Sequence, residues 1–155
     1  MKIETVVIIY KPPKILLGMK KKGFGVGNYN GFGGGVEKEE TLEECVIRGT
    51  KEEAGITILD HVKSGKILFR FESKEPDHLV HFFMTDKFVG SPSESEKMKP
   101  KWFNEKEIPY SKMWPGDEYW LPILLKRREF EGEIKFYSNK KWKIKSFKVK
   151  KLIAT

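Results

Sequence analysis

Residues 34–56, GGVEKEETLEECVIRGTKEEAGI, decide the fold of this chain. A glycine turn leads into a helix signal, in which Thr41 is a preferred N-cap residue and Glu44, three residues later, completes a capping-box pattern. Gly55 stands where a helix commonly ends in a left-handed cap. The pattern therefore predicts a helix over 42–54.

The predicted helix carries many carboxylates, since seven glutamates lie within 37–53. Glu52 and Glu53 follow position 49 by three and four residues, so the three positions share one helical side. Such a cluster repels itself unless a cation compensates, and Mg²⁺ is often held by one or two carboxylates plus substrate phosphates. We expect Mg²⁺, or alternatively Mn²⁺, with the lysines at 20–22 steering a polyphosphate. The alternative for these glutamates is a solvated helix face.

The rest of the chain predicts mostly strands around a glycine-dense segment at 23–35. The predicted strands cover 3–10, 14–19, 57–59, 65–72, 78–89, 101–103, 131–137 and 141–150. A second helix is predicted over 117–129, with Asp117 near its start and Pro122 a few residues in. Residues 91–101 are polar and predict a loop. The fold class is therefore α+β with two helices.

The 155 residues suit one domain, which we place at 1–155. A chain that is 39% hydrophobic and 13% aromatic is not disordered, and no apolar run is long enough for a membrane helix. The start of the chain lacks a secretory cleavage site. A lone cysteine, Cys45, excludes an internal disulfide and fits a reducing compartment, so we expect a cytoplasmic protein, with nucleus or mitochondrion as alternatives. The three histidines have no spacing typical of metal ligands: His61, His78 and His81.

The formal net charge of +8 favours an anionic partner. Charge alone does not distinguish a nucleic acid, a membrane surface or a small phosphorylated molecule. Seven lysines gather within 140–151, where Trp142 and Ile144 alternate with basic residues. We interpret this end as a strand with a solvated basic face, and keep nucleic-acid binding as the last alternative.

The first stretch also carries a spaced set of residues that resembles the Nudix hydrolase box. The set comprises Gly34, Glu40, Arg48, Glu52, Glu53, Gly55 and Ile56. Three further segments, LLGMKKKGFGVGNYNGFGGGV, KPKWF and MWPGDEYWLPILL, are similar to the MutT homologues within that family. The resemblance covers roughly residues 3–137 and implies a mixed sheet sandwiched between helices, in α/β/α layers.

The resemblance implies a Mg²⁺-dependent enzyme that cuts oxidised purine nucleoside triphosphates, such as 8-oxo-dGTP and 2-hydroxy-dATP, to monophosphate and pyrophosphate. It also implies a monomer with a small-molecule substrate, without a stable nucleic-acid or membrane partner. Two alternatives stay open at this point. One is a nucleotide-binding relative with impaired catalysis, and the other is a hydrolase of a different nucleoside diphosphate-linked substrate.

The resemblance also implies roles for individual residues. The catalytic residues would be Glu53, Glu52 and Arg48, with Arg48 orienting a box glutamate. The metal ligands would be Glu52, Glu53 and the Gly33 carbonyl. The substrate-binding residues would be Thr5, Lys20, Phe24, Asn30, Phe69, Trp114 and Asp117, with the aromatic rings sandwiching a flat base. Without the resemblance, the aromatics would be assigned to the core, Asn30 to a turn and Asp117 to a helix N-cap.

Three positions depart from the family pattern. Gly49 stands where the box has a glutamate that normally binds metal, and glycine also weakens a helix by about 1 kcal/mol relative to alanine. Lys97 stands where the family has a loop carboxylate, for which Glu96 or Glu94 is the substitute within reach. Gly116 replaces the first of two adjacent aspartates, so we hypothesise a narrower or shifted base preference.

Overall fold

A mixed β-sheet forms the frame of the molecule, as seen in the computed structural model, which describes residues 1–138 and 141–153. Its strands run in the order β11-β10-β6-β7-β1-β2-β3, while β4 pairs with β1 and β9 pairs with β2. The bounds are β1 (Lys2–Lys11), β2 (Lys14–Lys20), β3 (Tyr29–Asn30), β4 (Phe32–Gly35), β6 (Val62–Phe71), β7 (His78–Thr85), β9 (Met98–Asn104), β10 (Arg128–Phe136) and β11 (Trp142–Leu152). Two short strands, β5 (Thr57–Ile58) and β8 (Phe88–Val89), form a separate pair.

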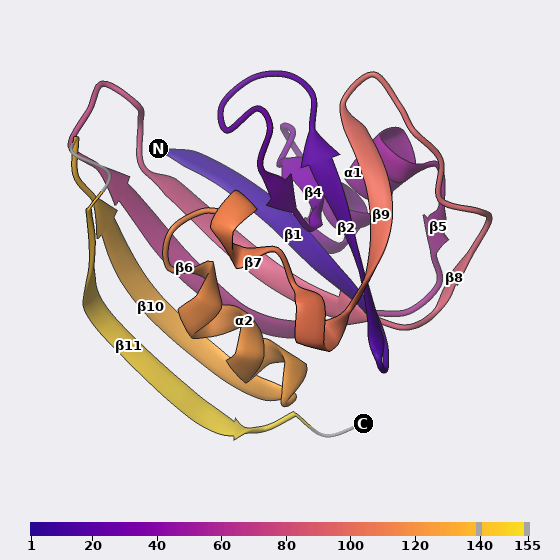
Figure 1. Ribbon diagram of the computed structural model, residues 1–155. Helices are drawn as coiled ribbons and strands as arrows, with labels where there is room; N and C mark the ends of the chain where they lie inside the picture. The colour runs from indigo at the N-terminus through magenta and orange to yellow at the C-terminus, as the bar shows by residue number, and fades with distance from the viewer. Residues whose placement is uncertain (139–140, 154–155) are drawn as a thin grey trace.

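Two helices cover opposite faces of this sheet (Figure 1), as the predicted α/β/α layering requires. Strand β1 explains the arrangement, because successive side chains of a strand point to opposite faces. Val7 and Ile9 pack in the core that includes Val46 of α1 (Leu42–Ala54), whereas Ile8 packs in the core that includes Leu121 of α2 (Asp117–Leu125). Short 3₁₀ turns at Glu105–Glu107 and Tyr110–Lys112 lead into α2.

The structure confirms α1 to the residue. Thr41 accepts from the Glu44 backbone N–H at 3.0 Å, and the Glu44 carboxylate accepts from the Thr41 N–H at 2.9 Å. Gly55 adopts the left-handed conformation with φ 73°, and its backbone N–H donates to the Lys51 carbonyl in the last turn of the helix. Each of these signals lies within a few residues of the helix end it fixes, which is why the sequence predicted it.

The second helix is shorter than predicted, ending at Leu125 instead of 129. Arg127 has φ 59° and its N–H bonds back to the Leu124 carbonyl, so the chain reverses there. β10 then begins at Arg128, three residues before the predicted strand, and its fully buried Phe130 lies opposite Gly65 of β6. Burial of this aromatic in the sheet core outweighs the helical signal of the preceding residues.

Two strand predictions also need correction. The predicted strand at 78–89 is interrupted after Thr85, where the Thr85 hydroxyl accepts from the Lys87 N–H at 2.9 Å, and the chain resumes as β8. The predicted loop at 91–101 ends early, because β9 begins at Met98 and pairs with β2 along its length. An edge strand buries few side chains and can therefore be built from polar residues, which in the sequence resemble a loop.

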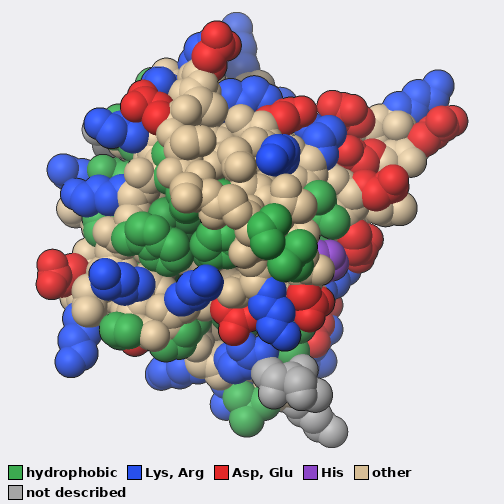
Figure 2. Space-filling model, turned by 90° about the vertical axis from the view of Figure 1, so that its right-hand side faces the viewer, with side chains coloured by type: hydrophobic (Ala, Val, Ile, Leu, Met, Phe, Trp, Pro, Cys, Tyr) green, Lys and Arg blue, Asp and Glu red, His purple; other side chains and the backbone are tan. Residues whose placement is uncertain are grey.

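One face of the molecule, which carries β5, β8 and β9 on the right of Figure 1, shows hydrophobic side chains in its middle with Lys and Arg around them (Figure 2). Lysines and aromatics contact each other there: Lys11 Nζ lies 4.6 Å from the Phe88 ring centre, and Phe88 stacks on Trp102. None of the helices in the described part of the chain has the length and apolarity to cross a membrane. Lys140, one of the lysines of the basic end, lies outside the described residues.

Candidate active site

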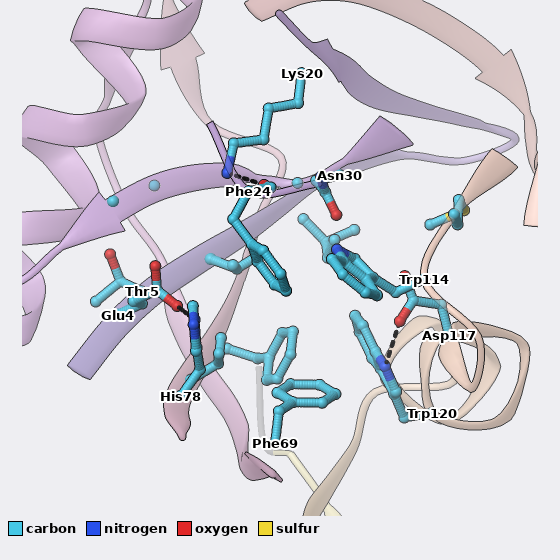
Figure 3. A pocket seen from close by; sticks show the side chains of 18 of the residues that line it. Glu4, Thr5, Lys20, Phe24, Asn30, Phe69, His78, Trp114, Asp117 and Trp120 are labelled. Atoms are coloured by element: carbon cyan, nitrogen blue, oxygen red, sulfur yellow. Dashed lines mark hydrogen bonds and ion pairs between the residues drawn. The ribbon is translucent and has the colours of Figure 1, made fainter. Parts of the chain in front are cut away.

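A pocket opens between β1, the glycine-dense loop and α2 (Figure 3). All seven predicted substrate-binding residues line it: Thr5, Lys20, Phe24, Asn30, Phe69, Trp114 and Asp117. Gly33 and Glu53 line it as well, so the pocket reaches the N-terminal end of β4 and the acidic side of α1. Glu52 and Arg48 lie outside the lining; Glu52 is exposed and Arg48 is half-buried. The fold thus brings residues from distant segments to one cavity.

The aromatic residues predicted to bind the base contact one another and their neighbours in the pocket. Phe24 stacks on Trp114, with ring centres 4.9 Å apart and planes at 28°. Phe69 stacks instead on Phe136, at 5.9 Å and 13°. Phe24 therefore covers one face of the Trp114 indole, and Phe69 contributes to the wall of the pocket.

Asp117 is a buried carboxyl group in the pocket wall, and the N-cap interpretation is wrong. Gly116 takes the N-cap position with φ 99°, and no side chain caps the helix there. The Asp117 side chain instead accepts from Trp120 Nε1 at 3.1 Å, and the residue is 5% exposed. Burial raises the pKa of Asp117 to about 8, so at neutral pH the group carries a proton that it can donate.

Glu53 is the carboxylate placed between α1 and the pocket. The Gly33 backbone N–H donates to its Oε1 at 2.8 Å, which fixes the side chain against β4. Desolvation raises the pKa of Glu53 to about 7, against the opposing effect of that hydrogen bond. A carboxylate with a pKa near the working pH is suited to take a proton from a reacting group.

Arg48 connects α1 to the segment before it through hydrogen bonds. Its guanidinium donates to both Glu40 oxygens, at 2.6 and 2.9 Å, and to the Gly35 carbonyl at 2.9 Å. It also reaches Glu52 at 3.2 Å, one turn along the helix. The bonds from Arg48 hold the pKa of Glu40 at about 2. This geometry is that of a residue which orients box glutamates without contacting the pocket.

Gly49 lets α1 approach β4 very closely. A Cβ atom added at this position would overlap the backbone carbonyl of Gly33, including its oxygen and carbon. The Gly33 oxygen, the predicted backbone metal ligand, therefore faces the helix backbone at Gly49. Position 49 lacks the family carboxylate and, in this packing, also lacks room for one.

Lysines neutralise most of the other carboxylates around the site. Lys97 donates to Glu52 Oε2 at 2.9 Å, and the pair lowers the pKa of Glu52. The two glutamates expected to substitute for the loop carboxylate are also paired: Lys21 contacts Glu94 at 2.6 Å and Lys22 contacts Glu96 at 3.4 Å. Two of the three lysines expected to steer phosphate thus have carboxylate partners.

The metal site implied by the sequence can be compared with this donor set. Among the described residues, no three His, Cys, Asp or Glu side chains converge on one point. Glu53, however, is desolvated, and in the described part of the chain no lysine or arginine forms an ion pair with it. Glu52 lies beside it on the helix. One or two carboxylates plus substrate phosphates are the usual ligands of Mg²⁺, so these residues fit a cation that arrives with its substrate.

Two further polar residues line the pocket, Glu4 and His78, and no sequence motif predicted them. The two side chains are hydrogen-bonded to each other, and His78 is 8% exposed. Parallel pairing of β1 with β7 brings them together. No local motif marks such a pair, since the residues lie on strands far apart in the chain.

The chain is similar to known proteins along most of its length. The family model described as the NUDIX domain matches residues 2–124. The chain is 43% identical over 135 residues to the oxidized purine nucleoside triphosphate hydrolases of Mus musculus and Danio rerio, covering 87% of this chain and 86% of each relative.

Solved structures show the same fold. A crystal structure of a MutT protein from Bacillus halodurans superposes with a TM-score of 0.80 at 21% identity, covering 96% of this chain and 97% of that one. At this identity the likeness concerns the fold alone. The matched domain model, the vertebrate relatives and the layered sheet agree, and the chain belongs to the Nudix family.

Proposed function

We propose that this protein hydrolyses oxidised purine nucleoside triphosphates, of the 8-oxo-dGTP type, to the nucleoside monophosphate and pyrophosphate. The observation that carries the proposal is one pocket lined both by aromatic side chains and by a helix carboxylate, Glu53. The vertebrate relatives at 43% identity are named for this activity. The corresponding biological role is sanitation of the nucleotide pool, by a monomer in the cytoplasm.

The residues of the pocket divide between base recognition and chemistry. Asn30 offers both an amide donor and an acceptor, and a protonated Asp117 offers a donor beside Trp114. Because Gly116 supplies no second carboxyl group, we infer that purine donor patterns are read by Asp117 and Asn30 together. Lys20 lines the same pocket and provides a positive charge for the phosphates.

Glu53 is the proposed general base. With its Oε1 held by the Gly33 N–H, the carboxylate can take a proton from the attacking water as the new P–O bond forms. The bond between the α-phosphorus and its bridging oxygen breaks, and pyrophosphate leaves with the electron pair of that bond. Nudix hydrolases generally use divalent metals such as Mg²⁺, which here would be held by Glu53 and Glu52 and would neutralise phosphate charge.

The test is steady-state hydrolysis of 8-oxo-dGTP beside dGTP with Mg²⁺, with the products resolved by chromatography. Glu53→Gln is expected to lower kcat by about 10²- to 10⁴-fold, the usual contribution of a positioned base. Glu43→Gln is the matched control, because Glu43 is exposed in the first turn of the same helix. Full activity of Glu53→Gln, or release of inorganic phosphate as the first product, would contradict the proposal.

A second candidate function is nucleotide binding with little turnover. It is favoured by the absence of a carboxylate at Gly49 and by the Lys97–Glu52 pair, which places an ammonium where the family has a carboxylate. Tight binding of 8-oxo-dGTP by a protein that releases no product would favour this candidate over the enzyme.

A further inference from the structure

Lys97 is held beside the acidic side of α1 by hydrogen bonds of its own loop. The Ser95 hydroxyl donates to the backbone carbonyl of Glu53 at 2.8 Å, and it accepts from the Lys97 backbone N–H at 3.2 Å. The Lys97 carbonyl accepts from the Lys21 N–H at 2.9 Å, just past the end of β2. The backbone at Lys97 is therefore anchored both to the C-terminal part of α1 and to β2.

The Lys97 ammonium lies beside the two carboxylates proposed to hold the metal. Its Nζ donates to Glu52 Oε2 at 2.9 Å, and Arg48 donates to the same carboxylate at 3.2 Å from one turn earlier on the helix. Desolvation raises the pKa of Glu53, and the positive charges of Lys97 and Lys20 oppose that rise. Both ammonium groups therefore lie close enough to act on the carboxylate that lines the pocket.

The two lysines come from the same end of one strand pair. Lys20 ends β2 and lies opposite Met98, which begins β9 and directly follows Lys97. Lys20, Met98 and Glu53 all line the pocket, and Figure 3 shows Lys20 at the opposite end of the pocket from Phe69. Lys97 itself is not part of the lining, so its ammonium lies just beyond the part of the pocket that Glu53 lines.

The Lys97 ammonium has donors available for a ligand. An ammonium carries three N–H groups, and within the described residues one acceptor, Glu52, is bonded to Lys97 Nζ. The Lys97 side chain is 56% exposed, so the other two N–H groups are accessible from solvent. Phosphate oxygens are strong acceptors for such charged donors. The ammonium can therefore bridge Glu52 and a phosphate group.

We propose that Lys97 is a phosphate-binding residue for the di- or triphosphate chain of the nucleotide. With Gly49 in the helix and Lys97 on Glu52, the site offers few free carboxylates to a divalent cation, and the ammonium groups supply part of the positive charge that such a cation would bring. The protein therefore binds a diphosphate group even without Mg²⁺. The inference rests on the proposed function in taking a nucleoside triphosphate as the substrate.

The first test is calorimetric binding of inorganic pyrophosphate in metal-free buffer, which needs neither a base nor turnover. The unmodified protein is expected to bind, and Lys97→Gln to bind about tenfold or more weakly, the usual effect of removing a charged hydrogen bond. Lys99→Gln is the matched control, because Lys99 is exposed on the same strand and, as the neighbour of Met98, points to the other face.

Three results of this titration would overturn the inference. The first is absence of pyrophosphate binding by the unmodified protein, and the second is an unchanged affinity in Lys97→Gln. The third is an equal loss of affinity in Lys99→Gln, which would assign the effect to net charge.

A second test separates a phosphate contact from a structural role of the Lys97–Glu52 ion pair. Glu52→Gln removes the ion pair but leaves the ammonium in place, so metal-free pyrophosphate binding is expected to stay equal or become tighter. Mn²⁺ binding by the same variant is expected to weaken, because a carboxylate ligand is lost. A loss of pyrophosphate affinity in Glu52→Gln as large as that in Lys97→Gln would show that the ion pair is what matters and would overturn the inference.

The two proposals can fail separately. A protein that binds pyrophosphate through Lys97 without metal, but does not hydrolyse 8-oxo-dGTP, refutes the enzymatic function and leaves the phosphate-binding role intact. A protein that hydrolyses 8-oxo-dGTP with Mg²⁺, but binds pyrophosphate equally well after Lys97→Gln, refutes the phosphate-binding role alone.

Discussion

Asp117, a buried residue of the pocket wall, makes the stability of the protein depend on pH. Its carboxyl group is buried beside Trp120, and burial raises its pKa from 3.8 to about 8. The folded state therefore holds this proton at pH values where the unfolded chain has lost it. The stabilisation is complete below about pH 4 and is lost as pH rises to about 8.

We predict that Asp117→Asn removes this part of the pH dependence. A pKa difference of one corresponds to about 1.4 kcal/mol, so the variant should gain a few kcal/mol over the unmodified protein between pH 5 and pH 8. The asparagine oxygen can still accept from Trp120. Urea unfolding at both pH values measures the difference, and parallel pH profiles of the two proteins would contradict the prediction.

Lys97 is the second residue with a predictable effect, this time on metal affinity. Its ammonium contacts Glu52, one of the proposed metal ligands, at 2.9 Å. Lys97→Glu removes this competitor and adds an oxygen ligand, so we predict Mn²⁺ binding tighter by about tenfold or more.

Electron paramagnetic resonance of free Mn²⁺ reports this affinity without any turnover. Lys101→Glu provides the charge-matched control, because Lys101 lies on β9 with its Nζ over the Phe103 ring. Equal tightening in both variants would assign the effect to net charge and refute the specific role of Lys97.

At the scale of elements, the contact between α1 and β4 depends on the missing side chain of Gly49. A Cβ added there overlaps the Gly33 carbonyl, and backbone cannot move aside as a flexible side chain can. Helix propensity alone predicts that Gly49→Ala stabilises the protein by about 1 kcal/mol. We predict the opposite sign, with a net destabilisation of about 1–2 kcal/mol from overpacking.

Chemical unfolding of Gly49→Ala decides between these signs. Lys51→Ala, at an exposed position of the same helix, serves as the comparison for propensity without a steric conflict. A gain in stability for Gly49→Ala would mean that the helix moves freely away from β4. Gly49→Glu would then become a simple restoration of the box.

The elements that the sequence predicted well are those whose signals are local. The helix α1 is bounded by Thr41 and Gly55, and both act within one turn of the helix end. β9 was predicted only in part, because its order comes from pairing with β2 and not from its own polar residues. The contact of His78 with Glu4 depends on parallel strand pairing, about which a single sequence carries no local information.

In the candidate site, too, the features with local sequence signals could be predicted and the long-range contacts could not. The box glutamates and the pocket aromatics could be placed from spaced motifs, and the pocket lining contains the expected substrate-binding residues. The detailed contacts could not be predicted: Phe24 stacks on Trp114, and Gly33 lies against Gly49. These contacts depend on the exact approach of separate elements, which is set by packing across the whole core.

At the scale of the whole molecule, the positive charge has a structural role at the edge of the sheet. Strand β11 ends the strand order and pairs with β10, so its other side presents backbone groups to which another chain could add. Lys143, Lys145 and Lys148 are exposed along this strand. Lysines on an edge strand repel a second copy of the same edge.

We predict that replacing Lys143, Lys145 and Lys148 together by threonine promotes self-association, which light scattering after size exclusion would detect as a mass above the 18.1 kDa of one chain. The replacement lowers the formal net charge from +8 to +5, that is, 8 minus 3. The same change in net charge at Lys101, Lys106 and Lys112, which are exposed away from β11, is expected to leave a monomer. A triple β11 variant that stays monomeric at high concentration would show that these lysines do not protect the edge, and association of both variants would assign the effect to total charge.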